Sequence, residues 1–162
     1  MACAYLLCGE VGCGKTTYAK AWEERTGGFV LSCDDLMLTL FDTCIGPERH
    51  QAMSSRCKSF LYEQALSLLR KGMDVMLDFG YWSRTERTEA RRFFLLHGFP
   101  VQLIHLHAEP DVITTHLALR NRAVETEGLR AYHIDAEKRA RFHAQFEPPQ
   151  ADEVDQFVRI SS

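Results

Sequence analysis

The chain has 162 residues, of which 46% are hydrophobic and 25% are charged. This length allows one well-buried core and leaves little room for another, so we expect a single domain over residues 1–162. The formal net charge of −3 offers no broad attraction to a polyanion such as a nucleic acid.

The targeting and redox signals of the sequence are weak. No stretch approaches the roughly 18 consecutive apolar residues of a transmembrane helix, and the first four residues lack the charged start of a signal peptide. We therefore expect a cytoplasmic protein. We also expect its thiols to be reduced, because no two of its cysteines form a C-x-x-C pair. The six cysteines are Cys3, Cys8, Cys13, Cys33, Cys44 and Cys57.

A phosphate-binding motif follows the first predicted strand. Residues 4–8 are a short apolar run that predicts a buried strand, and residues 16–24 predict a helix. Residues 9–16, Gly-Glu-Val-Gly-Cys-Gly-Lys-Thr, match the P-loop pattern between these two elements. The glycines let the backbone N–H groups turn inward, and the helix dipole adds positive charge there. The sequence therefore predicts a binding site for the phosphates of a nucleotide.

The motif assigns a role to each polar side chain. Lys15 would lie against the β- and γ-phosphates, the Thr16 hydroxyl would bind Mg²⁺, and Thr17 would lie near the α-phosphate. Oxidation of Cys13 would block the site, so a redox role for this thiol stays open. The predicted nucleotide-binding residues of the loop are Gly9, Gly12, Cys13, Gly14, Lys15, Thr16 and Thr17.

The later elements alternate between strands and helices. Further strands are predicted at residues 28–32, 74–78, 101–107 and 156–160, and further helices at 47–71, 83–97, 109–122 and 134–146. This alternation favours an α/β fold with a parallel sheet of about five strands, covered by helices on both faces. In such sheets ligands bind at the carboxyl ends of the strands, where the P-loop, residues 32–35 and residues 78–82 are expected to converge.

The acidic strand ends suggest phosphoryl transfer. Asp34 directly follows the second strand and is the predicted general base for a hydroxyl acceptor. Asp35 is expected to cap the next helix or to contact the acceptor, and Asp78 to hold the metal or the acceptor. The alternatives, in which both aspartates after the second strand only cap a helix and Asp78 only forms a turn, stay open.

Other nucleotide-dependent classes are disfavoured by the sequence. Residues 121–124, Asn-Arg-Ala-Val, do not match the N-K-x-D signature of GTPases, and no L-S-G-G-Q-like segment of transporter ATPases is present. The chain is also too short for the additional helical domain of ring-forming ATPases. A small kinase remains.

Basic and aromatic residues supply further candidates. Arg120 and Arg122 enter a polar segment, about residues 120–135, that resembles a mobile lid, and one of them would reach the transferred phosphate. Tyr81, Arg84 and Arg87 are candidates for holding the acceptor by stacking or charge. Exposed helix surfaces explain these arginines almost as well, and the two histidines of the fourth strand, 105 and 107, are expected to be packed rather than metal-binding.

Several of these segments resemble a known group of proteins. Residues 9–17, 32–35, 77–80 and 119–122 are similar to the small P-loop kinases, which include chloramphenicol phosphotransferase, zeta toxin and the kinase domain of polynucleotide kinase. Within this group the whole chain is similar to predicted kinases described only as ATP-binding proteins, in which Phe-Glu-Pro-Pro, residues 146–149, also recurs. The resemblance implies a three-layer P-loop NTPase fold, nucleoside-kinase-like, with a short lid.

The resemblance also implies roles for individual residues. It gives Asp34 the general-base role, Lys15 and Thr16 the phosphate and Mg²⁺ roles, and Arg120 and Arg122 adenine-edge or lid roles. Polynucleotide kinases place an arginine shortly after the acidic pair, whereas this chain has the apolar residues 36–41, Leu-Met-Leu-Thr-Leu-Phe. That departure favours a small, partly hydrophobic acceptor, although ordinary helix packing is the alternative.

The sequence therefore predicts an ATP-dependent kinase that uses Mg²⁺ and phosphorylates a hydroxyl of a small molecule. A polynucleotide 5′-hydroxyl kinase is the second hypothesis. The third is an ATP-binding regulatory module with little turnover. The acceptor, the choice of ATP over GTP and the oligomeric state are left open.

Overall fold

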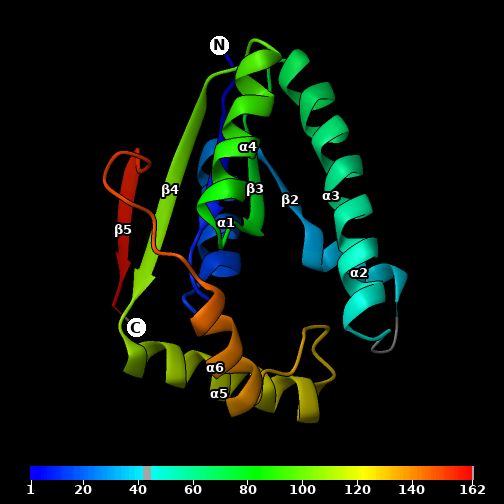
Figure 1. Ribbon diagram of the computed structural model, residues 1–162, viewed down its shortest axis with the longest axis vertical. Coiled ribbons are helices and arrows are strands. Elements are labelled where there is room, and N and C mark those ends of the chain that lie inside the picture. The colour runs from blue at the N-terminus through cyan, green and yellow to red at the C-terminus, as the bar shows by residue number, and fades with distance from the viewer. Residues whose placement is uncertain (42–44, 162) are drawn as a thin grey trace.

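A computed structural model describes residues 1–41 and 45–161. Its centre is one five-stranded sheet in the order β2-β3-β1-β4-β5, and every neighbouring pair of strands is parallel (Figure 1). The strands are β1 (Ala4–Cys8), β2 (Phe29–Ser32), β3 (Val75–Gly80), β4 (Val101–Ala108) and β5 (Gln156–Ile160). The predicted five-stranded parallel sheet is confirmed.

Helices cover both faces of this sheet. They are α1 (Lys15–Thr26), α2 (Cys33–Leu40), α3 (Pro47–Arg70), α4 (Arg84–Leu96), α5 (Pro110–Glu127) and α6 (Ala136–Gln145). Figure 1 shows α4 on one face and α1 on the other, with α5 and α6 below the carboxyl ends of the strands. The architecture is the three-layer α/β arrangement predicted from the sequence.

The two faces of the strands build two separate cores. Leu6 and Leu77 point into a core shared with α2, α3 and α4, whereas their neighbours Leu7 and Met76 point into a core shared with α1 and α5. Successive side chains of a strand alternate between faces, so a continuous apolar run is required when both faces are covered. The runs in β1 and β3 meet this requirement, which is why they could be recognised as buried strands.

The structure adds one helix whose bounds the sequence did not predict, α2, and lengthens another, α5. The helix α2 begins directly after β2, so residues 36–41 are largely helical, and Met37 packs in the core with its Sδ 3.6 Å from the Cys57 Sγ. Ordinary packing thus accounts for Met37, the most buried residue of that apolar segment. The helix α5 continues to Glu127, beyond the predicted end near Arg122, and Gly128 closes it with a φ of 65°.

Most of residues 120–127 are polar, but arginine, alanine and glutamate, which make up five of the eight, are good helix formers, and polarity alone does not end a helix. The part of the predicted lid outside regular structure is therefore only the loop of residues 128–135.

No helix within the described ranges is long and apolar enough to cross a membrane. The five cysteines in these ranges are free and buried, while Cys44 lies outside the described residues.

Candidate active site

The phosphate loop connects β1 to α1 at the carboxyl edge of the sheet. Gly12 and Gly14 have φ values of 83° and 101°, and Gly14 is the N-cap of α1. A glycine supplies no side chain to cap the helix, so the N–H groups of the first turn of α1 stay available to an anion. The local geometry is that of an open anion site.

The ammonium group of Lys15 is fixed in place beside this site by hydrogen bonds. Its ammonium Nζ donates hydrogen bonds to the carbonyl oxygens of Gly9, at 2.9 Å, and Glu10, at 2.7 Å. An ammonium group has three N–H donors, and the third has only a long contact of 3.9 Å to the Cys13 Sγ. Two main-chain bonds thus orient the charge, and one donor is left for a phosphate oxygen.

Cys13 supports the loop from beneath. Its side chain is 1% exposed, and a Cβ placed on Gly9 would lie 2.6 Å from the Cys13 Sγ and 2.7 Å from the Leu106 carbonyl oxygen. Only glycine fits at position 9. Burial raises the pKa of the Cys13 thiol, which suppresses the reactive thiolate, so the thiol environment opposes redox control at this position.

Asp78 meets Thr16 where β3 and β1 end side by side. The Thr16 hydroxyl donates to the Asp78 Oδ2 over 3.5 Å. Burial raises the pKa of Asp78 to about 6; Lys15 and the Thr16 bond oppose this shift, whereas Asp34 and Asp35 add to it. The carboxylates of Asp34 and Asp35 therefore lie close enough to that of Asp78 to repel it.

Asp34 and Asp35 lie in the first turn of α2 and are both exposed. The cap of this helix is Ser32, whose hydroxyl oxygen accepts a hydrogen bond of 3.2 Å from the Asp35 N–H. The prediction that Asp35 caps the helix through its side chain is wrong, because the serine one position before the helix already does so. Both carboxylates consequently remain free of capping and close to Asp78.

The hydroxyl of Thr16 and the carboxylate of Asp78 form an oxygen donor set that suits Mg²⁺, a hard cation. No group of three histidine, cysteine or acidic side chains within residues 1–41 and 45–161 is arranged to hold a metal ion. Mg²⁺ in nucleotide sites is commonly held by one or two protein ligands together with phosphate oxygens, which this pair would allow.

The arginines of α5, which were expected at the end of a helix, lie before its last turn, because α5 continues to Glu127. The Nε of Arg120 is buried and has no hydrogen-bond partner among the described residues, whereas Arg122 is exposed. Between them, the Asn121 amide donates to the Ile134 carbonyl at 2.7 Å and accepts from the Ile134 N–H at 2.9 Å. This paired bond fixes the end of the loop 128–135 to α5.

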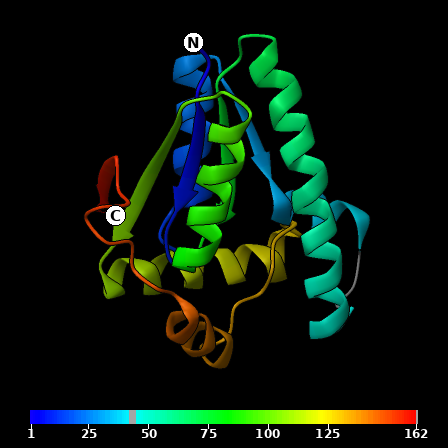
Figure 2. The same cartoon turned by 45° about the horizontal axis from the view of Figure 1, so that its top comes forward.

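The loop 128–135 crosses toward α2 and α3 (Figure 2). The Arg130 Nη1 donates to the Thr39 Oγ1 at 3.4 Å, and the rings of Tyr132 and His50 meet edge to face at 5.7 Å between centroids. The loop therefore bridges the two sides of the carboxyl edge. Neither contact was predicted, since no local pattern links residues that are 91 and 82 positions apart.

The helix α6 adds a contact to the phosphate loop itself. The His143 Nδ1 lies 2.9 Å from the Glu10 Oε2, and the ring of Phe142 packs against Trp82 at 5.0 Å between centroids. Sequence analysis missed both His143 and Glu10, because a histidine on an exposed polar helix carries no signal of its partner. The helix α6 therefore contacts the phosphate loop directly.

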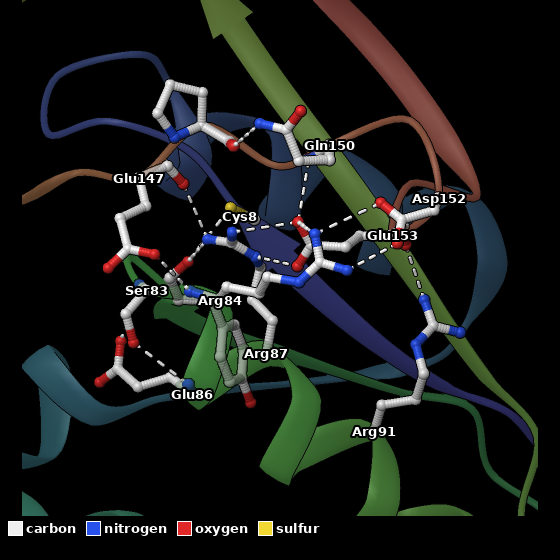
Figure 3. A network of polar contacts seen from close by, with 12 residues as sticks. Cys8, Ser83, Arg84, Glu86, Arg87, Arg91, Glu147, Gln150, Asp152 and Glu153 are labelled. Carbon is white, nitrogen blue, oxygen red and sulfur yellow. Dashed lines mark hydrogen bonds and ion pairs between the residues drawn. The ribbon is translucent and has the colours of Figure 1, made fainter.

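Three residues that were predicted to hold the acceptor make contacts with other parts of the protein instead, which corrects the sequence prediction. Tyr81 is 3% exposed, and its hydroxyl lies 3.1 Å from that of Tyr62 in the core. Arg87 is also 3% exposed and binds the Glu153 carboxylate at 2.8 Å, while Arg84 pairs with Asp152 at 2.6 Å (Figure 3). These arginines bind the segment between α6 and β5, because their face of α4 packs against that segment.

The two histidines of β4 are packed, as predicted. His105 and His107 both contact the ring of Phe157 on β5, at 5.3 and 6.0 Å between centroids.

Comparisons with solved structures support the assignment of the fold. A putative kinase from Chloroflexus aurantiacus is similar with a TM-score of 0.74 and 14% identity, covering 98% of this chain and 87% of that one. The Mycobacterium tuberculosis APS kinase CysC, solved with AMPPNP and APS, is similar with a TM-score of 0.68 and 18% identity, covering 99% and 90%. A gluconokinase from Sinorhizobium meliloti gives a TM-score of 0.65 at 15% identity, covering 98% and 83%.

At these identities the likeness shows a shared fold. No curated protein is significantly similar to the chain in sequence. The family described as "AAA domain" (AAA_33) matches residues 5–149, which is most of the chain and contains the whole site described above. The protein belongs to this P-loop family, with the α/β fold of the small kinases.

Proposed function

We propose that the protein is an ATP-dependent kinase that transfers the γ-phosphate to a hydroxyl group of a small molecule with the help of Mg²⁺. The observation that carries the proposal is the gathering of Lys15, Thr16 and Asp78 at one edge of the sheet, with Asp34 and Asp35 close enough to raise the pKa of Asp78. A phosphate loop faced by free carboxylates suits transfer to an acceptor that must lose a proton.

Different residues would bind the phosphates, hold Mg²⁺ and accept the proton of the acceptor. The third N–H of Lys15 would bind the β- and γ-phosphates, and the first-turn N–H groups of α1 would bind the same chain of phosphates. Thr16 and Asp78 would hold Mg²⁺, which draws charge from the phosphate oxygens. Asp34 is exposed in the first turn of α2 and would accept the hydroxyl proton of the acceptor.

The arginines of α5 are assigned to the nucleotide and to the transferred phosphate. Arg120 has a buried Nε without a partner in the described ranges, so a bound nucleotide would supply the missing acceptor. Arg122 is exposed on the same helix and would stabilise the charge that develops on the transferred phosphate. The bridge of the loop 128–135 to α2 and α3 would shield the site from water during transfer.

The fold comparisons are consistent with a kinase and leave the acceptor open. The solved structures include a gluconokinase and an APS kinase with bound AMPPNP, whose acceptors differ chemically. We place the acceptor among small molecules, because the net charge of −3 gives no general attraction to nucleic acid.

The proposal is tested with γ-labelled ATP, Mg²⁺ and a small-molecule extract, comparing the wild type with Asp34→Asn. We expect a labelled extract component with the wild type and at least about a 100-fold slower appearance of it with the variant, as for loss of a general base. An oligonucleotide with a free 5′-hydroxyl is offered in parallel. Label on the oligonucleotide alone would favour the polynucleotide kinase, and nucleotide binding without any transferred label would favour the regulatory module.

A further inference from the structure

The peptide bond between Gly12 and Cys13 is held from both ends. Its carbonyl oxygen, on Gly12, lies 2.9 Å from the Nδ1 of His116 in α5. Its N–H, on Cys13, donates to the Glu10 carbonyl oxygen at 3.2 Å. A carbonyl oxygen only accepts, so the His116 Nδ1 carries the proton in this bond. The central peptide of the phosphate loop is thus tied to a helix more than a hundred residues further along the chain.

The orientation of this peptide has to be fixed by contacts with other residues, because the torsional preference of glycine does not fix it. Gly12 has a φ of 83°, and glycine populates both signs of φ with similar ease, so its own torsional preference does not select this orientation. The phosphate affinity of such a loop depends on which way its N–H groups point. An interaction that fixes one peptide of the loop therefore fixes the neighbours that would bind phosphate.

The same peptide controls the position of Lys15. The Glu10 carbonyl oxygen that accepts from Cys13 N–H also accepts from the Lys15 Nζ at 2.7 Å. A rotation of the Gly12–Cys13 peptide would remove one of these two bonds and move the Cys13 side chain from its place beneath Gly9. The ammonium charge would then lose part of its orientation.

The helix α5 is seated closely against this part of the loop. A Cβ on Gly12 would lie 2.8 Å from the Leu117 Cγ and 3.2 Å from the Ile113 Cγ2, and one on Gly14 would lie 3.9 Å from the His116 Cε1. Ile113 and Leu117 supply apolar packing only. His116 is the residue of this helix face that supplies a directional bond to the loop.

We propose that His116 is a positioning residue of the nucleotide site, which orients the phosphate loop through the Gly12 carbonyl. The inference rests on the nucleotide-binding half of the proposed function and goes beyond it by assigning a residue outside the P-loop motif. It also couples the loop to α5, the helix that carries Arg120 one turn later.

The test separates the hydrogen bond from packing. In asparagine the Nδ2 occupies nearly the place of the histidine Nδ1, so His116→Asn keeps the donor, whereas His116→Leu keeps the volume and removes it. We expect His116→Leu to weaken the binding of a fluorescent ADP analogue in Mg²⁺ by about 3- to 10-fold, the effect of one lost hydrogen bond. His116→Asn should bind within about twofold of the wild type.

The control is Leu119→Ala, since Leu119 lies on the same helix and is 61% exposed; its ADP affinity should equal that of the wild type. Equal affinities of His116→Leu and the wild type would overturn the inference, as would equal weakening in the asparagine and leucine variants. These results leave the kinase proposal standing. Conversely, ADP binding with the expected order of variants but no phosphorylated product would remove the kinase proposal and support the inference.

Discussion

At the scale of single residues, the electrostatics of the site converge on Asp78. Burial is the largest influence on this carboxyl group and raises its pKa to about 6, with the acidic residues after β2 acting in the same direction. A carboxyl group in such surroundings is costly to ionise unless a cation is supplied. At neutral pH without a ligand, the ionised Asp78 carboxylate is therefore destabilised by burial and by repulsion from Asp34 and Asp35. The binding of Mg²⁺ would offset this repulsion.

The stability of the ligand-free protein should reflect this shift. Because the folded pKa of Asp78 lies above the unfolded value of 3.8, its contribution to stability is complete below about pH 4 and is lost as the pH rises through 6. Asp78→Asn cannot ionise, so its free energy of unfolding relative to the wild type should rise by up to about 3 kcal/mol between about pH 4 and pH 8. Urea unfolding without Mg²⁺ or nucleotide measures the difference.

The matched control for this experiment is Glu24→Gln, at an exposed carboxylate of α1. Its free energy of unfolding relative to the wild type should change little over the same pH range. A constant difference between Asp78→Asn and the wild type at all pH values would contradict the assigned role of burial.

At the scale of elements, α4 acts as an anchor for the C-terminal segment. Three arginines, one or two turns apart on this helix, bind residues 147–155. Arg84 pairs with Asp152 and Arg87 with Glu153 (Figure 3), and Arg91 pairs with Asp155. The Arg87 Nη1 also donates to the carbonyl oxygens of Tyr81 and Glu147, each at 3.0 Å. This guanidinium thus joins the end of β3 to the segment that connects α6 with β5.

Loss of this anchor should destabilise the fold strongly. Arg87→Met would leave the Glu153 carboxylate, only 9% exposed, with only the more distant Arg84 guanidinium at 3.7 Å, and breaking a buried pair in this way costs about 3–5 kcal/mol. The double variant Arg87→Met/Glu153→Met should recover part of that loss, since no unpaired charge remains. Urea unfolding of both variants and of Arg92→Met, at an exposed position of the same helix, provides the comparison.

An Arg87→Met variant as stable as Arg92→Met would show that the ion pair contributes nothing. If the double variant were instead no more stable than the single one, the cost would come from the lost main-chain bonds to Tyr81 and Glu147.

At the scale of the whole molecule, the site is assembled from distant parts of the chain. The phosphate loop, the ends of β2 and β3 and the helices α5 and α6 all lie at the carboxyl edge of the sheet (Figure 1). A ligand bound there contacts several elements and should stabilise the protein as a unit.

Nucleotide should therefore raise the melting temperature. Mg·ADP at 100 times its Kd adds about 2.7 kcal/mol, which corresponds to an increase in Tm of about 5–10 °C for a protein of this size. Lys15→Ala should abolish most of this increase, because the oriented ammonium is lost. Differential scanning fluorimetry measures the shift; an equal shift in wild type and variant would contradict binding at the phosphate loop.

The order of the elements and the phosphate loop were predictable because their signals are local. Apolar runs in β1 and β3, glycines at positions with positive φ and a lysine at a fixed spacing act over fewer than ten residues. The position of Asp78 next to Thr16 followed from the rule that parallel strands end at the same edge. Helix ends were less predictable, as the extension of α5 to Glu127 shows.

The sequence by itself determined the fold class, the nucleotide loop and the acidic strand ends, since each depends on spacing within one element or on the shared direction of the strands. Only the tertiary structure decided the partners of the long side chains. The packing of helices that are distant in sequence places Arg87 against Glu153 instead of in the nucleotide site. It also places His116 and His143 beside the phosphate loop. A long polar side chain has no preferred partner until the elements around it are placed, because its energy depends on burial and on neighbours that local sequence does not specify.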